Sequence, residues 1–232
     1  MKLELHQALF WCEQLAAVAI LLQSIELIFL RRKIMEIWQK DLLPSQFLRI
    51  SGCIGLFISP DPLFHLSILA GTLISSKQLR GTFNGGSDIM TFHVLLAVTL
   101  ARLFPSAEFM AQIALGYLAL QLVLSYFISG LVNVRKKSWR EGSALKNIVT
   151  AQFYDVPHSI RSKNISWKHL GWATMLFELL FPLALVNTTV AVIMITIALI
   201  FHLGNFVVLG LNRFVFAWLA AYPALIWLSG IR

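Results

Sequence analysis

Long runs of apolar residues, broken by short polar connections, make up most of this chain. A helix that crosses the hydrocarbon core of a bilayer needs about 20 predominantly apolar residues. Several runs approach or exceed that length, and basic clusters bound them. The pattern therefore predicts membrane-spanning helices over residues 9–30, 92–104 (beginning near residue 87), 108–132, 167–186, 190–211 and 214–231.

The stretch 47–76 is also apolar, but Ser59-Pro60-Asp61-Pro62 interrupts it. Two prolines cannot stand inside an uninterrupted helix without loss of backbone hydrogen bonds. Either one kinked span or a hairpin of two short segments fits this pattern. Positive charge gathers on the cytoplasmic side of membrane proteins, and the hairpin puts nearly all Lys and Arg residues on one side. A single span would instead put the basic residues of 31–49 opposite those of 135–168.

We therefore favour the hairpin and expect a polytopic helical bundle of about seven or eight membrane segments, with both termini on the non-cytoplasmic side. Composition agrees with a membrane protein. The chain is 58% hydrophobic and 13% charged with a mean hydropathy of +0.75, whereas soluble domains carry roughly 45–50% apolar and about 25% charged residues. We expect one all-α integral membrane domain over residues 1–232.

The formal net charge of +8 lies in the connections between apolar runs. It is better explained by membrane topology and anionic lipid headgroups than by nucleic acid. The bilayer is therefore the expected partner, and no nucleic acid is expected. Cys12 and Cys53 lie in apolar stretches without metal-binding spacing, which predicts packing residues and no metal site.

The connection 133–166 is basic and contains a second periodicity. Leu145, Ile148, Val149 and Phe153 recur at helical spacing, with polar residues between them. The spacing predicts a short amphipathic helix. It either lies on the membrane surface or packs against the rest of the protein.

Ionisable side chains inside a span are costly and mark candidate functional sites. Counted from the predicted inner ends of their helices, Glu178 lies roughly 15 Å deep and His202 roughly 14 Å deep. On consecutive antiparallel helices the two could hydrogen-bond. Such a pair serves proton transfer, with the histidine as base and the carboxylate orienting it, or it satisfies two buried polar groups. Glu13 lies near the end of its span, where a side chain can reach water.

Further polar residues fall in the same half of the membrane as this pair, namely His93, Tyr126, Asn205 and Glu26. The sequence names His202, Glu178 and His93 as candidate catalytic residues. Tyr126, Asn133 and Asn205 are the candidate cofactor-binding residues.

Five segments resemble the horizontally transferred transmembrane (HTTM) domain family, which includes the vitamin K-dependent gamma-carboxylases. They are Tyr126-Phe-Ile-Ser-Gly130, Ser138-Trp-Arg-Glu-Gly-Ser-Ala-Leu145, Asn84-Gly-Gly-Ser-Asp88, Phe177-Glu-Leu-Leu-Phe-Pro182 and Phe201-His-x-x-Asn205. The resemblance covers roughly residues 80–230. It implies a helical membrane domain that holds a quinone-like apolar cofactor.

In the carboxylases a lysine shortly after the Tyr-Phe-x-x-Gly segment deprotonates vitamin K hydroquinone. The matching positions here are Val132 and Asn133, and neither side chain takes up a proton at neutral pH. Carboxylation itself is therefore not expected. Carboxylases also act from the lumenal face, whereas charge places the connection 133–166 in the cytoplasm.

The sequence leaves the function class open. One hypothesis is a membrane redox or peptide-modifying enzyme with a quinone-like cofactor between its helices. A second is a non-catalytic membrane subunit that anchors or matures a protein or peptide partner through the connection 133–166. A third is a transporter whose site is the broken helix at Pro60 and Pro62, although no internal repeat supports it.

Overall fold

The computed structural model describes residues 3–38, 41–79, 85–104, 106–151 and 165–231. Within these ranges the chain is helical and forms no strand. Four helices are long and apolar enough to cross a membrane, fewer than the expected seven or eight segments. They are α1 (Leu5–Phe29), α5 (Gly86–Leu103), α6 (Glu108–Arg135) and α11 (Thr188–Leu209). The all-α expectation is confirmed for the described residues.

The interrupted stretch 47–76 forms a hairpin of two helices, α3 (Leu43–Ile58) and α4 (Pro62–Gln78). Pro62 occupies the first turn of α4, where its missing N–H costs no helical hydrogen bond. The Asp61 side chain caps this helix by accepting a hydrogen bond of 2.8 Å from the Leu63 backbone N–H. The predicted break is confirmed, and the alternative of one kinked helix is wrong.

Two further apolar helices are shorter or contain proline. Helix α10 (Trp167–Leu180) passes into a 3-10 helix, η2 (Phe181–Leu185), so the predicted α-helix over 167–186 ends early. Pro182 explains the change, because it has no N–H to donate to the α-helical ladder. Helix α12 (Asn212–Ser229) contains Pro223.

Short helices fill the polar connections: α2 (Arg31–Trp38), α7 (Lys137–Arg140) and α8 (Ser143–Thr150). The predicted amphipathic helix corresponds to α8. Val149 is buried, and Leu145 and Ile148 line a cavity of the protein, so the apolar face of α8 is turned toward its own chain. Phe153 lies outside the described residues.

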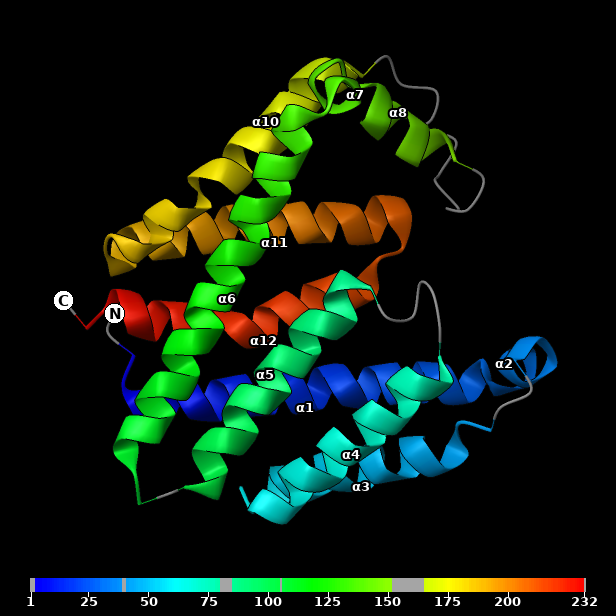
Figure 1. Ribbon diagram of the computed structural model, residues 1–232, viewed down its shortest axis with the longest axis vertical. Coiled ribbons are helices and arrows are strands. Elements are labelled where there is room, and N and C mark those ends of the chain that lie inside the picture. Colours follow the sequence, from blue (N-terminus) through cyan, green and yellow to red (C-terminus); the bar gives the residue numbers. More distant parts are fainter. Residues whose placement is uncertain (1–2, 39–40, 80–84, 105, 152–164, 232) are drawn as a thin grey trace.

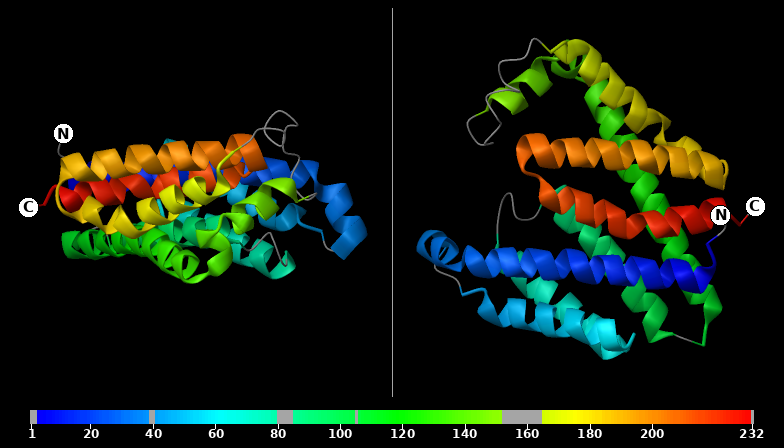
Figure 2. Two further views of the ribbon diagram at one scale, coloured as in Figure 1. Left: turned by 90° about the horizontal axis from the view of Figure 1, so that it is seen from above. Right: turned by 180° about the vertical axis from the view of Figure 1, so that it is seen from behind.

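Figure 1 shows α1, α12 and α11 side by side, with α6 crossing all three diagonally and α5 crossing α12 and α1. Seen from above in Figure 2, α11 and α12 lie on one side of the molecule and α6 on the other. The buried contact surface is rich in alanine, including Ala16, Ala97, Ala119 and Ala221. Small side chains let helix backbones approach closely, which is how helices associate where lipid removes the hydrophobic driving force. The start of α1 and the end of α12 lie at the same end of the molecule.

Candidate functional site

A cavity of about 590 Å³ lies between the crossing helices. Its walls come from α5, α6, α10, α11 and α12, and α7 and α8 contribute Trp139, Leu145 and Ile148. We call it the central cavity. All six candidate site residues line it: His93, Tyr126, Asn133, Glu178, His202 and Asn205.

Tyr126 and His202 form the buried polar centre of this cavity. The Tyr126 hydroxyl lies 2.7 Å from His202 Nε2 and 3.1 Å from the Tyr222 hydroxyl. His202 Nδ1 is buried without a hydrogen-bond partner among the described residues. A buried polar atom without a partner is uncommon in proteins and calls for an explanation, such as a bound group.

Glu178 accepts hydrogen bonds from side chains of α6. Ser129 Oγ donates to Glu178 Oε1 at 2.8 Å, and Asn133 Nδ2 donates to Oε2 at 3.3 Å. The carboxylate is only 5% exposed. No cation pairs with it among the residues that the structure describes. Neutral donors alone therefore stabilise this buried acid. Burying an acid without a cationic partner is energetically costly, and inside a membrane segment it marks a candidate functional residue.

Glu178 and His202, which the sequence allowed to hydrogen-bond, do not bond to each other. Both side chains reach the central cavity, as their matching depths predicted, but each bonds to α6 instead of to the other. Depth along a helix follows from residue counting, whereas the direction of a side chain around the axis follows from packing. Glu178 and His202 therefore line one cavity without bonding to each other, and their role as a site stays a prediction.

A glycine sets the distance between α6 and α10 beside the acid. A Cβ atom at Gly130 would lie 2.9 Å from Glu178 Cβ and 2.9 Å from the Leu179 backbone nitrogen. Such distances are not tolerated by real side chains. Gly130 therefore lets the two helices approach closely enough for Ser129 and Asn133 to reach the carboxylate.

The remaining two candidates, His93 and Asn205, are less buried than Glu178 and His202. His93 Nδ1 is 2.5 Å from the Tyr117 hydroxyl, on an exposed pair. The side chain of Asn205 is half-buried and lines the cavity. Its backbone carbonyl accepts a 3.4 Å hydrogen bond from the Leu211 N–H at the end of α11.

Aromatic rings form much of the apolar wall. The rings of Phe214 and Trp218 stack with centroids 5.2 Å apart and an interplanar angle of 15°. The ring centroid of His202 lies 4.9 Å from that of Trp218 and 5.3 Å from that of Phe201, to which the His202 ring is inclined by 62° in an edge-on arrangement. An apolar cavity with flat walls and a few convergent polar groups suits a planar ring ligand.

The residues described in the structure contain no group of three His, Cys, Asp or Glu side chains that could hold a metal ion. The described residues of the central cavity instead provide side chains that can hydrogen-bond to a ligand and aromatic rings that can stack on it.

The comparisons with known proteins identify no relative. No family model matches the chain, and neither a curated protein nor a solved structure matches it.

Sequence reasoning missed Tyr222, Ser129 and Trp218. Tyr222 stands in an apolar run beside Pro223, and nothing in the linear pattern distinguishes it from a packing residue. Ser129 carries a weak signal, since it lies one helical turn before Asn133 on the same face of α6.

The expectation for Glu13 was wrong. Its side chain is fully buried, and it pairs with Arg102 at 2.7 Å and with His65 Nε2 at 2.5 Å. These three residues tie α1, α4 and α5 together. Glu26, which was grouped with the site, instead accepts a 3.2 Å hydrogen bond from Arg213 Nε outside the central cavity.

Proposed function

We propose that this chain is a multi-pass membrane protein whose central cavity binds a planar, apolar ring ligand of the quinone class. The observation that carries the proposal is the convergence of six polar side chains on one cavity with aromatic walls. Stacked Phe214 and Trp218 match the faces of a flat ring. Tyr126, His202 and Glu178 supply the hydrogen-bonding groups that would fix the orientation of its oxygen atoms.

The cavity groups are also suited to moving protons. Quinones take up and release protons together with electrons, so a site for such a molecule needs neighbouring groups that exchange protons. Among the described residues, one ring nitrogen of His202 has no hydrogen-bond partner and the Glu178 carboxylate has no cation within ion-pair distance. His202 is the candidate base, with Tyr126 orienting its ring through Nε2.

The resemblance to the HTTM family supports the same ligand class and argues against carboxylation. Asn133, which matches the position of the carboxylase lysine, donates to Glu178. An amide at this place cannot deprotonate a hydroquinone. We propose a redox or peptide-modifying enzyme of the wider family in which the carboxylate and histidine replace the lysine.

We further propose that the shorter helices cross the membrane with the four long ones. Successive helices run in alternating directions in Figure 1, and α2 and α7 carry basic residues. In that topology both termini lie on the non-cytoplasmic side. The segments are α1, α3, α4, α5, α6, α10 with η2, α11 and α12.

Quenching of tryptophan fluorescence by menadione, a short naphthoquinone, tests the ligand class. Trp139 and Trp218 both line the cavity, so a bound quinone should quench them in a saturable way. We expect His202→Ala to weaken the apparent affinity about tenfold, the loss of one good hydrogen bond in a buried site. His169→Ala is the matched control, because His169 is an exposed residue at the start of α10. Equal quenching in all three proteins would contradict the proposal.

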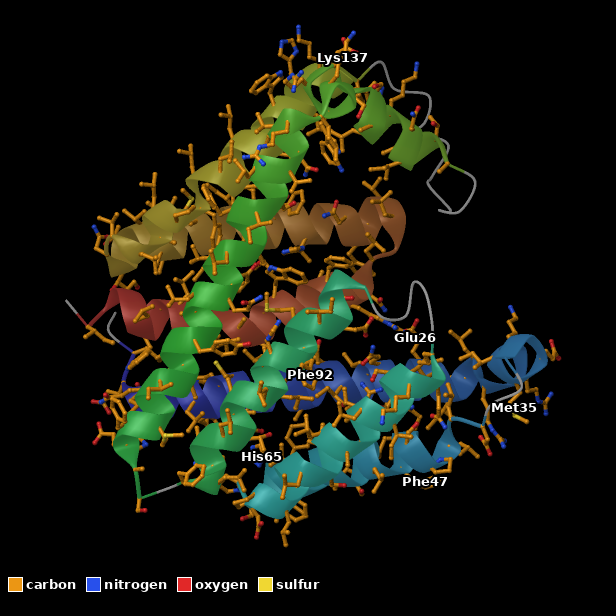
Figure 3. The ribbon with its side chains drawn as sticks, in the orientation of Figure 1. Glu26, Met35, Phe47, His65, Phe92 and Lys137 are labelled. Atoms are coloured by element: carbon orange, nitrogen blue, oxygen red, sulfur yellow. The ribbon has the colours of Figure 1, made fainter. Side chains whose placement is uncertain are left out.

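A second function, a membrane subunit that holds a partner, is favoured by one feature. Lys137 is exposed at the end of the molecule opposite Phe47 (Figure 3), where the basic residues Lys136 and Arg140 also lie. Replacing Lys136 and Lys137 by Gln should release a protein that co-purifies through this surface. A complex that survives this change would remove the hypothesis.

A further inference from the structure

A second cavity, of about 330 Å³, lies between the α3–α4 hairpin and helices α1 and α5. We call it the hairpin cavity. Of the residues that the structure describes, Ile89 and His93 alone line both cavities, so α5 forms the wall between them. Figure 3 shows Phe92, another lining residue, where α5 crosses α1. The proposed function does not use this cavity.

A buried arginine lines the hairpin cavity. Arg49 is 2% exposed, and its Nη1 donates to Gln46 Oε1 at 3.1 Å while Nη2 donates to Gln23 Oε1. Its Nε has no hydrogen-bond partner among the described residues. The guanidinium therefore contacts two neutral amide oxygens, and no carboxylate of the described residues lies within ion-pair distance of it.

Such an arrangement is unusual for a cation inside an apolar bundle. A charge removed from water is normally paired with an opposite charge, because neutral groups replace only part of its hydration. The nearest acid in the cavity wall is Asp88, which Gln23 Nε2 contacts. Arg213 lies 3.9 Å from Asp88 and also bonds to Glu26, so the acids here are already shared by another arginine.

A second polar atom in the same wall is also without a partner. Thr72 Oγ1 on α4 is buried and forms no hydrogen bond within the described residues, and Thr72 lines the hairpin cavity with Arg49. An arginine N–H and a threonine hydroxyl are both donors to an oxyanion. Two buried donors without partners among the described residues therefore line one cavity from facing helices.

The rest of the wall is apolar. Leu27, Leu73, Leu79, Ile89 and Phe92 supply hydrocarbon and aromatic surface. Such a surface fits a chain or ring, whereas a small hydrated ion would gain nothing from it. The cavity thus presents a cationic polar end and an apolar remainder.

The fold positions Arg49 by a close helix contact. A Cβ at Gly71 would lie 2.7 Å from Arg49 Cγ and 2.7 Å from the Ser45 carbonyl oxygen. The arginine stem therefore lies across a glycine of the facing helix, which leaves its guanidinium at the cavity.

We propose that the hairpin cavity binds an amphipathic oxyanion, a carboxylate or phosphate group carried on an apolar chain. Arg49 pairs with the oxyanion, Thr72 donates its hydroxyl, and the apolar side chains of α1, α4 and α5 contact the chain. The site makes the α3–α4 hairpin a ligand-binding element as well as a membrane segment.

Binding of tritiated oleate to the full chain in phosphatidylcholine nanodiscs tests the proposal, with empty nanodiscs subtracted. We expect saturable binding that oleyl alcohol displaces at least about tenfold less well than unlabelled oleate, because the alcohol has the same chain without the charge. Displacement by lysophosphatidate but not by inorganic phosphate identifies a lipid as the source of the anion. Equal displacement by inorganic phosphate would show that the apolar chain contributes nothing to binding and would contradict the proposal.

Single substitutions test whether oleate binds in the hairpin cavity. Arg49→Gln should raise the oleate dissociation constant about tenfold or more, Arg49→Lys should retain part of the affinity, and Thr72→Val should weaken it severalfold. Arg31→Gln, which removes an exposed arginine, is the control and should bind as the wild type does. If Arg49→Gln does not fold, two other measurements test the proposal. They are the displacement of oleate by oleyl alcohol on the wild type and the binding of oleate to Thr72→Val. Equal displacement by alcohol and acid, or unchanged binding to Arg49→Gln, would overturn the proposal.

Discussion

At the scale of single residues, the central cavity depends on polar side chains that were individually recognisable from the sequence. His202, Glu178 and Tyr126 stand out because ionisable or polar groups are rare inside apolar helices. Their partners do not stand out. Tyr222 and Ser129 become recognisable only when the helices are packed, because a tyrosine or serine in a membrane helix is common and uninformative by itself.

Tyr126→Phe should destabilise the protein. The change leaves His202 Nε2 buried without its 2.7 Å hydrogen bond, and an unsatisfied buried polar group costs about 1–3 kcal/mol. Unfolding in detergent mixed with increasing sodium dodecyl sulfate measures the loss. Tyr222→Phe is the control, because it removes the longer 3.1 Å bond and leaves the bond between Tyr126 and His202 intact. A loss in Tyr222→Phe as large as in Tyr126→Phe would argue against this assignment.

Arg102→Met should destabilise the protein more strongly. Glu13 is fully buried and, among the described residues, would keep His65 alone as a partner. Removal of one partner of a buried ion pair costs up to roughly 3–5 kcal/mol. Arg102 is partly exposed, so we expect a value at or below the lower end of this range. The same unfolding assay applies. Arg31→Met, at an exposed ion pair with Asp41, should change little, and equal effects of the two changes would contradict the account.

At the scale of helices, most elements could be predicted. The apolar runs identified α1, α5, α6, α11 and α12 within a few residues, because length and hydropathy dominate in a bilayer. Pro60 and Pro62 identified the hairpin. The end of α10 at Leu180 was not predicted, although Pro182 in the sequence indicates a break in the α-helix. The rotation of each helix about its axis could not be predicted, since it follows from close contacts such as the one at Gly130.

Gly130→Ala tests that contact. The added methyl group would lie 2.9 Å from Glu178 Cβ, so α6 and α10 must move apart, and overpacking of this kind costs typically about 1–3 kcal/mol. Gly116→Ala is a matched control on the same helix, because nothing lies within 4 Å of its added Cβ. We expect Gly116→Ala to be neutral or stabilising, since alanine favours helix over glycine by roughly 0.5–1 kcal/mol. If both variants lose stability alike in the unfolding assay, the helices do not meet at Gly130.

At the scale of the whole molecule, the proposed topology assigns the chain termini and the basic connection with Lys137 to opposite sides of the membrane. The start of α1 and the end of α12 lie at one end of the molecule. The loop that contains Ser106, between α5 and α6, is expected on the same side of the membrane as these termini, and the basic connection with Lys137 on the other. The proposed orientation rests on the distribution of charge alone.

Cysteine labelling checks this topology. Cys12 and Cys53 are buried and free, so new cysteines at Ser106 and Lys137 can be labelled against a quiet background. A membrane-impermeant maleimide should label Ser106→Cys in intact cells and Lys137→Cys only after permeabilisation. Labelling of both, or of Lys137→Cys alone, in intact cells would contradict the proposed orientation.

Mass spectrometry of small molecules that co-purify with the detergent-solubilised protein tests whether the central cavity holds a quinone-class ring ligand. Wild type, His202→Ala and the control His169→Ala are compared at equal protein amounts, with unfolding checked for each. The account predicts a quinone in wild type and in His169→Ala that is lost or strongly reduced in His202→Ala. A folded wild-type protein without such a molecule, which also fails to take up added menadione, would contradict it.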